Sequence, residues 1–181
     1  INGVNIHRVD CLNSRYLFTF LSIPKVLKLA KNADLIHTTT FNGAFPAWIA
    51  SKLTKKPSVI TIHEVWVGKW KKLTDMNSFS CLIHDILERM VYLLNFDKYV
   101  CVSKSTQKQL GKIKKSVVIY NGVDYKFWNP KLYDGRPIRK KLGLNEFVYM
   151  FYGRPGVSKG LEYLIKAVPL ISEKIPNSKL V

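Results

Sequence analysis

The stretch KPSVITIHE, residues 56–64, holds a short β-branched run that begins after a proline and ends at two polar side chains, His63 and Glu64. A continuous β-branched run predicts a strand covered on both faces, which is typical of parallel sheets. Residues 58–62 are therefore expected to form a central strand. His63 and Glu64 are expected at its carboxyl end.

The segments around this strand alternate between short apolar strands and amphipathic helices. Further strands are predicted at residues 4–9, 35–37, 98–102, 116–120 and 147–152, and from residue 179. Helices are predicted at residues 20–31, 44–54, 81–94, 104–110 and 160–171, and residues 126–139 are predicted to be a linker followed by a short helix. This alternation predicts an α/β fold with a parallel sheet.

Polar residues follow several of these predicted strands. Ligands of parallel α/β sheets bind at the carboxyl ends of the strands, so residues at those ends are candidate site residues. The residues that fall there are His63, Ser103, Asn121 and Arg154. For Ser103 the capping of the helix that follows is explanation enough, and for His63 the alternative is a hydrogen-bonded structural histidine.

The stretch GRPGVSKG, residues 153–160, places two cations where a predicted strand turns into a predicted helix. Backbone N–H groups and the positive end of the helix dipole suit a phosphate at such a place. Arg154 offers a planar fork for phosphate oxygens, Lys159 adds a point charge, and Gly153 lets the backbone approach closely. The alternative is a solvated turn that carries two surface cations.

The composition favours an anionic partner. The 181 residues include 29 Lys and Arg against 12 Asp and Glu, a formal charge of +17. Nucleotide diphosphates, nucleic acid or an anionic membrane face would all fit this charge, and so would a basic surface without a specific partner. No apolar run reaches the roughly 18–20 residues that span a bilayer.

The cysteine and histidine pattern predicts neither a disulfide framework nor a metal site. The 3 cysteines are far apart, and no Cys/His spacing is typical of zinc. Cys81 and Cys101 lie in apolar surroundings and are expected to be reduced core residues. The default setting that follows is a reducing, cytoplasmic one.

The stretch VWVGKWKK, residues 65–72, mixes tryptophans with lysines. Tryptophan rings at headgroup depth and lysines on lipid phosphates suit a membrane interface, and the same pair suits stacking on bases. The alternative is a loop that packs its tryptophans internally. The candidate membrane- or acceptor-contacting residues are Trp66, Lys69, Trp70, Lys71 and Lys72.

Taken in order, these motifs resemble one known family. The motifs are DLIH at 34–37, KPSVITIHE at 56–64, VSKST at 102–106, VIYNGVD at 118–124 with Phe127, and YGR-x4-KGL at 152–161. Their order is similar to that of family-4 retaining glycosyltransferases of the GT-B fold. The NGVD turn followed by GR-x4-KG is the most specific part of the resemblance.

The resemblance implies transfer of a sugar from a nucleotide-diphosphate sugar, with retention of configuration and no obligatory metal or other cofactor. Arg154 and Lys159 match the family's diphosphate-binding pair, with Gly153 beside them. His63 matches the catalytic histidine that faces the donor sugar. Glu64 and Ser103 would lie at the cleft, which Asn121 and Asp124 help to shape as part of the turn between domains.

The resemblance also implies two Rossmann-like domains, the first of which is a parallel sheet with helices on both faces. Residues 1–143 would be the acceptor-side domain, and 144–181 would be the first β-α unit of the nucleotide-sugar-binding domain. Compared with the family, the chain starts after the first strand and its glycine-rich loop, and stops before a pair of glutamates that grip the donor. We therefore expect residues 1–181 to be a partial chain without transfer activity by itself.

The expected partners are a nucleotide sugar, an acceptor that is a glycan or a lipid-linked sugar, and the anionic inner face of a membrane, which the protein would contact peripherally from the cytoplasm. One rival hypothesis is a non-catalytic binding or assembly protein on a degenerate glycosyltransferase scaffold. A nucleic-acid-binding protein is a third hypothesis that rests on charge only, and no nucleic acid is expected.

Overall fold

The structure, a computed structural model, describes residues 3–111 and 116–181, which fall into two compact units. Unit 1 comprises residues 1–68 and 79–121, and unit 2 comprises residues 69–78 and 122–181. Residues 1–2 and 112–115 of the first predicted domain lie outside the described residues. The predicted domain boundary between residues 143 and 144 falls inside unit 2 and stays a prediction.

Unit 1 is built on the parallel sheet that the sequence predicts. The sheet has 4 strands in the order β1-β2-β3-β4, all parallel. Its strands are β1 (Ile36–Thr39), β2 (Ser58–Ile62), β3 (Lys98–Cys101) and β4 (Ser116–Val118). Ile36 pairs with Ser58 and Val59 with Lys98, so the strands end close together along one edge.

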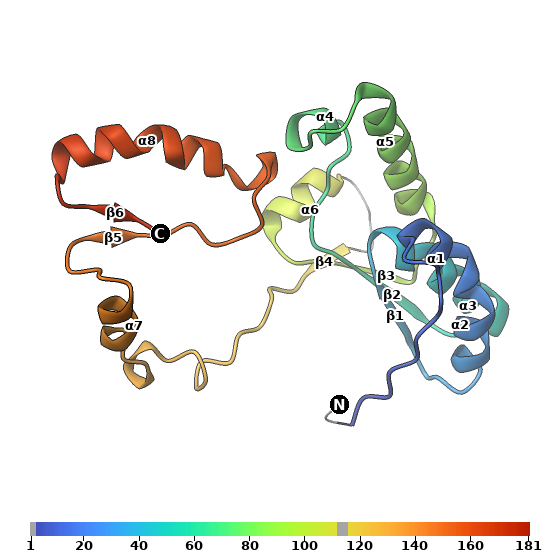
Figure 1. Ribbon diagram of the computed structural model, residues 1–181. Helices are drawn as coiled ribbons and strands as arrows, with labels where there is room; N and C mark the ends of the chain where they lie inside the picture. Colours follow the sequence, from blue (N-terminus) through green and yellow to red (C-terminus); the bar gives the residue numbers. More distant parts are fainter. Residues whose placement is uncertain (1–2, 112–115) are drawn as a thin grey trace. The chain divides into compact units, whose positions relative to one another are not determined.

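Helices cover both faces of this sheet, as the sequence predicts (Figure 1). In unit 1 they are α1 (Arg15–Leu21), α2 (Ile23–Ala30), η1 (Phe41–Gly43), α3 (Ala44–Thr54), α5 (Ser78–Leu93) and α6 (Lys104–Leu110). Helix α3 packs on β1, β2 and α2, and α6 packs on β3 and β4. Helices α3, α5 and α6 lie in the connections between the parallel strands, which need such crossovers.

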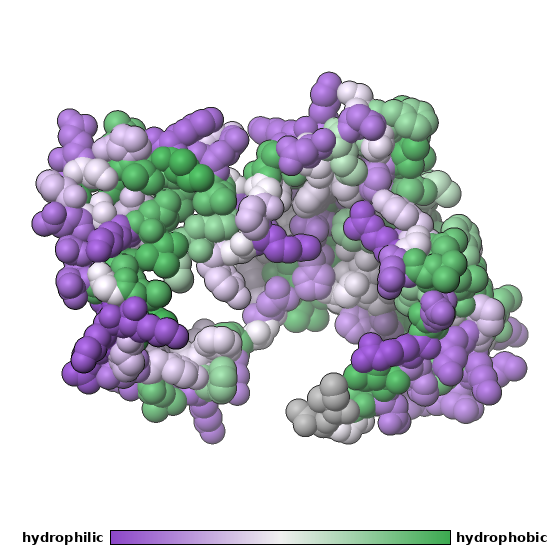
Figure 2. Space-filling view, in the orientation of Figure 1, coloured by the Kyte–Doolittle hydropathy of each residue, from purple (hydrophilic) through white to green (hydrophobic). Residues whose placement is uncertain are grey.

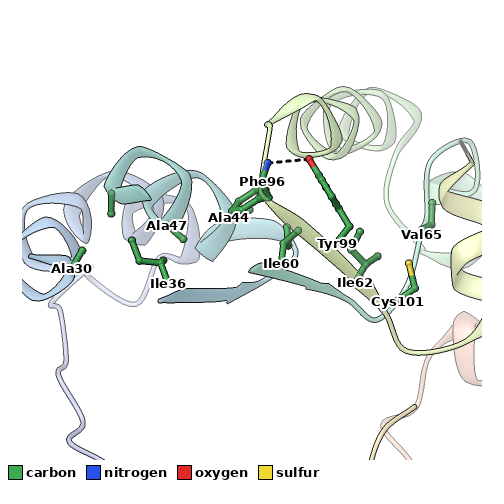
Figure 3. Packing of buried hydrophobic residues seen from close by; sticks show 11 residues of the cluster. Ala30, Ile36, Ala44, Ala47, Ile60, Ile62, Val65, Phe96, Tyr99 and Cys101 are labelled. Atoms are coloured by element: carbon green, nitrogen blue, oxygen red, sulfur yellow. Dashed lines mark hydrogen bonds between the residues drawn. The ribbon is translucent and has the colours of Figure 1, made fainter. Parts of the chain in front are cut away.

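The core of unit 1 forms where the strands meet these helices (Figure 3). Ile60, Ile62 and Cys101 of the central strands are 0% exposed, and so is Phe96, which precedes β3. The Tyr99 hydroxyl lies 3.3 Å from the Phe96 backbone N–H and accepts its hydrogen bond. The strand expected within KPSVITIHE is confirmed: Ser58, Ile60 and Ile62 are buried on one face, and Val59 and Thr61 are half-buried on the other.

Unit 2 contains a second, smaller parallel sheet. Its elements are α4 (Trp70–Leu73), η2 (Pro130–Leu132), α7 (Arg136–Lys141), β5 (Val148–Tyr149), η3 (Val157–Lys159), α8 (Leu161–Lys174) and β6 (Lys179–Leu180). Strands β5 and β6 pair in parallel across α8, which makes the predicted β-α unit. None of the residues that the structure describes in unit 2 is buried.

Three sequence predictions of secondary structure were wrong. Residues 4–9 form no strand; Val4 and Ile6 are 64% and 52% exposed, so their alternation matches no buried face. The helix predicted at 20–31 is divided into α1 and α2, because Pro24 has no N–H to donate to the preceding turn. The strand predicted at 147–152 is only β5, whose short partner β6 limits the ladder.

Two further expectations concern the cysteines and membrane spans. Cys81 and Cys101 are buried and free, as predicted. Among the described residues, no helix combines the length and the apolar character that crossing a membrane requires.

Candidate functional site

The carboxyl ends of the strands of unit 1 bring several predicted site residues to one edge. His63 and Glu64 follow β2 and are exposed, and Ser103 follows β3. The Thr106 hydroxyl donates to the backbone carbonyl of His63 at 3.4 Å. The Ser103 hydroxyl accepts from the Thr106 N–H at 3.0 Å, so it caps α6 as predicted. One residue, Thr106, thus connects the ends of β2 and β3.

The loop that follows His63 is held by two carboxylates of α5. Glu88, 2% exposed, accepts a hydrogen bond from the Trp66 backbone N–H at 2.8 Å. Asp85 accepts one from the backbone N–H of Gly68. That bond, followed by the bond from Arg89, lowers the pKa of Asp85 below its ordinary value. The carboxylates therefore position residues 66–68.

The buried end of this arrangement includes Tyr92. Its hydroxyl donates to Glu88 at 2.7 Å and lies 3.3 Å from the Glu64 carbonyl. Burial, and then the hydrogen bond to Glu88, raises the pKa of Tyr92. Sequence reasoning missed Asp85, Glu88 and Tyr92. Their signal is that they share one face of a helix whose opposite face is apolar.

A second feature that sequence reasoning missed is the turn after β1. Phe41 adopts a φ of 71°, a left-handed conformation that is uncommon for a residue with a large side chain. A Cβ atom on Gly43 would lie 2.9 Å from Oγ1 of Thr38. The threonine run HTTT followed by FNG was the available signal. This turn lies at the same edge of the sheet as His63, because β1 and β2 are parallel neighbours.

In unit 2 the stretch GRPGVSKG folds into a loop that closes just before α8. Lys159 donates its backbone N–H to Gly156, and Gly160 precedes α8 with a φ of 69°. Glycine adopts that φ without the strain that a side chain brings. Cγ of Lys159 lies 4.0 Å from where a Cβ on Gly153 would be, so the loop brings these two residues together.

Arg154 and Lys159 are both exposed. Within the described part of the chain, neither side chain forms a hydrogen bond or an ion pair. Two cations on a loop that leads into a helix N-terminus can hold the oxygens of a phosphate or diphosphate group.

The segment VWVGKWKK is divided between the two units. Trp66 is half-buried in unit 1, whereas Lys69, Trp70, Lys71 and Lys72 belong to unit 2. Helix α4, which holds the last three, lies against η3, with Cα atoms within 8 Å. The lysines of α4 therefore share unit 2 with Lys159.

Asn121 and Asp124 lie in the turn after β4. Asn121 is the last residue of unit 1, and Asp124 belongs to unit 2. The Asp124 carboxylate accepts from the backbone N–H groups of Lys126 and Phe127 at 2.9 and 3.0 Å. These two bonds form a local turn over residues 124–127.

A hollow of about 390 Å³ lies elsewhere, at the amino end of β2. It is lined by Ser51, Lys52, Lys55, Lys56, Pro57 and Asp97. Because β2 runs from Ser58 to Ile62, this hollow is at the opposite edge of the sheet from His63. Among residues 3–111 and 116–181, no group of three or more His, Cys, Asp and Glu side chains could hold a metal ion.

Residues 1–127 match Glycosyltransferase Family 4. The chain belongs to this family. The match covers both predicted motifs of the sheet edge, KPSVITIHE and VSKST, and the NGVD turn. The predicted family membership is therefore confirmed.

Two relatives extend the similarity over most of the chain. An uncharacterized glycosyltransferase of Methanocaldococcus jannaschii is 29% identical over 100% of this chain and 49% of its own length. The Escherichia coli UDP-Gal:alpha-D-GlcNAc-diphosphoundecaprenol alpha-1,3-galactosyltransferase is 31% identical over 90% of this chain and 43% of its own length. The chain thus spans about half the length of the curated relatives it matches.

The solved structures agree on the fold. HepE of Anabaena in complex with UDP-glucose has a TM-score of 0.71 and 24% identity over 88% of this chain and 42% of HepE. The same protein in complex with UDP and glucose has a TM-score of 0.70 and 25% identity over 87% of this chain and 41% of HepE. The α/β parallel architecture predicted from the sequence is confirmed.

Proposed function

We propose that the protein to which this chain belongs transfers a sugar from a uridine-diphosphate sugar to an acceptor hydroxyl, with retention of the anomeric configuration. Membership of Glycosyltransferase Family 4 supports the reaction class. The names of the Escherichia coli relative and of the HepE complexes support a UDP-sugar donor. Because the chain spans about half of its relatives, residues 1–181 would supply part of the site.

The observation that carries the proposal is the loop with Arg154 and Lys159. As the bond between the anomeric carbon and the diphosphate oxygen breaks, the bonding electrons stay on the diphosphate and its negative charge grows. Two exposed cations without protein partners among the described residues can stabilise that charge. The helix dipole of α8 acts in the same direction.

His63 and the residues beside it would form the donor-facing edge of the acceptor-side unit. The backbone carbonyl of His63 is held by Thr106, while its side chain is exposed and available to a sugar. In this role the His63 side chain accepts a hydrogen bond from the donor sugar or donates one to it. Glu64 and Ser103 lie at the same edge.

Arg154 and Lys159 would supply the positive charge that a divalent ion supplies in other phosphate-leaving reactions. No obligatory metal or other cofactor then takes part in the reaction, and excess EDTA should leave turnover unchanged. A fall in turnover with EDTA that magnesium restores would refute this part of the proposal.

The acceptor would be a glycan or, as in the name of the Escherichia coli relative, a sugar on a lipid diphosphate. A formal charge of +17 suits such an anionic acceptor at a membrane surface. We accordingly place the reaction at the inner, cytoplasmic face of the membrane. Lysines 69, 71 and 72 are the candidate contacts of unit 2 with this acceptor or surface.

Transfer of radiolabelled sugar from UDP-sugars tests the proposal in the whole protein to which this chain belongs and in three variants of it. Arg154→Ala and Lys159→Ala should each lower kcat/KM by about a hundredfold, because each removes a charge from the leaving group. Lys166→Ala, an exposed cation on α8, is the matched control and should retain activity. Full activity in Arg154→Ala and Lys159→Ala would remove the diphosphate assignment.

A further inference from the structure

Helix α5 presents a continuous apolar face to solvent. Residues three and four apart lie on the same face of a helix, and seven apolar residues of α5 follow that spacing. We call them the α5 stripe: Phe79, Leu82, Ile83, Ile86, Leu87, Met90 and Leu93. Their exposed fractions run from 40% to 83%. A contiguous apolar surface of this kind marks an interaction site more often than scattered exposed residues do.

The opposite face of α5 points into unit 1 and carries both apolar and polar side chains: Cys81 and Glu88 are buried, and Val91 packs against the core. Glu88 and Asp85 accept the backbone N–H groups of Trp66 and Gly68. His84 lies on the same side, 2.8 Å from the hydroxyl of Tyr16. Three contacts to two different segments fix the rotation of the helix. The helix thus buries a mixed face and leaves most of its large apolar side chains exposed, unlike an ordinary surface helix.

Helix α1 extends the apolar surface beside α5. The contact between Tyr16 and His84, with ring centroids 6.1 Å apart, places the start of α1 against α5. Leu17 and Phe20 of α1 are 41% and 62% exposed. Figure 2 shows hydrophobic side chains gathered on the part of unit 1 where α5 and α1 lie.

The charge of unit 1 identifies the kind of partner. The unit has 15 Lys and Arg against 6 Asp and Glu. Both carboxylates of α5, a helix described in full, hold backbone groups of the unit. The exposed charge beside the stripe is Arg89, whose side chain is 59% exposed and pairs with Asp85 at 2.8 Å, so the attraction to anionic lipid comes from the net charge of the unit as a whole. A second copy of so cationic a unit would be repelled, whereas an anionic lipid surface would be attracted.

The length of the helix fits a position within a membrane interface. Its 16 residues extend over about 24 Å, at 1.5 Å per residue. An interfacial helix lies parallel to the surface, with its apolar face among the upper acyl chains and cations near the phosphates. We propose that the α5 stripe, extended by Leu17 and Phe20, docks unit 1 on an anionic lipid bilayer.

This inference rests on the proposed function in one respect, since a lipid-linked acceptor gives an enzyme reason to lie on a membrane. When α5 docks, Glu88 and Asp85 would still hold the loop that follows His63. The proposed docking surface does not include the loop of Arg154 and Lys159.

Sedimentation with vesicles tests the docking. The protein should bind vesicles of phosphatidylcholine mixed with phosphatidylglycerol, and bind phosphatidylcholine alone much more weakly. Ile86→Glu combined with Met90→Glu should reduce partitioning into the mixed vesicles at least about tenfold, since two apolar side chains are lost from the interface. Leu53→Glu, at a residue of α3 that is 68% exposed, is the matched control and should bind like the unchanged protein. Unchanged partitioning of the double variant would overturn the proposal.

A fluorescent label separates the bilayer from a protein partner. An environment-sensitive dye is attached at Ile86→Cys in a Cys11→Ser background, because Cys11 is the half-buried free cysteine and the other two are buried. The emission should be that of a dye in water and should shift to the blue when mixed vesicles are added. A blue-shifted dye before any lipid is added would show that polypeptide covers the stripe, and would overturn the proposal.

Sugar transfer to a soluble acceptor, measured on the whole protein to which this chain belongs, distinguishes the two proposals. The double variant Ile86→Glu, Met90→Glu should keep that activity while it loses vesicle binding. Vesicle binding through the stripe without any transfer would refute the proposed function only. Transfer together with vesicle binding that the variant leaves intact would refute the docking surface only.

Discussion

Substitution of Glu88 by alanine should destabilise unit 1 strongly. The Glu88 carboxylate is 2% exposed and accepts hydrogen bonds from the Trp66 N–H at 2.8 Å and the Tyr92 hydroxyl at 2.7 Å. A hydrogen bond to a charged group contributes about 1.5–3 kcal/mol, so two of them contribute about 3–6 kcal/mol. Burial of the carboxylate costs free energy that the alanine variant no longer loses, so the net loss is smaller than this sum. We therefore expect a loss of about 3 kcal/mol in the free energy of unfolding.

Glu88→Gln should cost less, about 1 kcal/mol, because its amide oxygen can accept both bonds and only the charge is lost. The measurement is urea unfolding followed by circular dichroism. At a denaturant slope of about 2 kcal/mol per molar, the midpoint should fall by about 1.5 M for Glu88→Ala. Asp34→Ala, at an exposed carboxylate, is the control and should stay within about 0.5 kcal/mol of the unchanged protein.

Two results would contradict this account of the loop. One is a loss below about 1 kcal/mol for Glu88→Ala, which would mean that the two bonds contribute little. The other is an equal loss of stability for Glu88→Ala and Glu88→Gln, which would mean that the charge of Glu88, and not the oxygen that accepts both bonds, determines the stability. Tyr92→Phe, made in the unchanged protein and in Glu88→Ala, measures the coupling between the two residues. The substitution should cost about 1 kcal/mol in the unchanged protein and almost nothing in Glu88→Ala.

Three further predictions concern the same unit. Asp85 has a lowered pKa in the folded protein, so the stability that it contributes is present above its ordinary pKa of 3.8 and is lost as the pH falls further. In Asp85→Asn the free energy of unfolding, measured with urea, should therefore fall less between neutral and acid pH. An equal fall in the variant and the unchanged protein would refute this role of Asp85. Ser103→Ala should cost about 1 kcal/mol through loss of the helix cap, with Ser103→Thr as the control; equal stability of the alanine and threonine variants would contradict a capping role. Gly43→Ala should cost about 1–3 kcal/mol because the new Cβ would lie 2.9 Å from Oγ1 of Thr38, and Thr38→Ala should restore most of that loss; no restoration would show that the clash is not the cause.

The sequence predicts the central sheet well, because its strands carry continuous apolar runs and its helices carry helical periodicity. Residues 44–54 and 58–62 form α3 and β2 with the predicted bounds. The failures lie where local pattern competes with pairing. Residues 4–9 alternate without a buried face, and β5 is shorter than its apolar run because a strand extends only as far as its partner.

The candidate site was predictable where a residue type and a strand end coincide. The positions of His63 and Ser103 follow from β2 and β3, and Lys159 comes close to Gly153 because the loop closes at Gly160. The roles of Glu88 and Asp85 were not predictable, since a carboxylate in an amphipathic helix normally faces water. The sequence shows that the two carboxylates share a helix face, but the tertiary bonds from Trp66 and Gly68 reveal that this face points into the unit.

Titration of the protein with UDP, followed by isothermal calorimetry, tests the central claim most directly. The claim is that Arg154 and Lys159 bind the diphosphate of the donor. The unchanged protein and Lys166→Ala should bind UDP with the same affinity, whereas Arg154→Ala combined with Lys159→Ala should bind at least about a hundredfold more weakly, since each charged hydrogen-bond donor contributes about 1.5 kcal/mol or more. Equal affinity of the double variant and the unchanged protein would contradict the account.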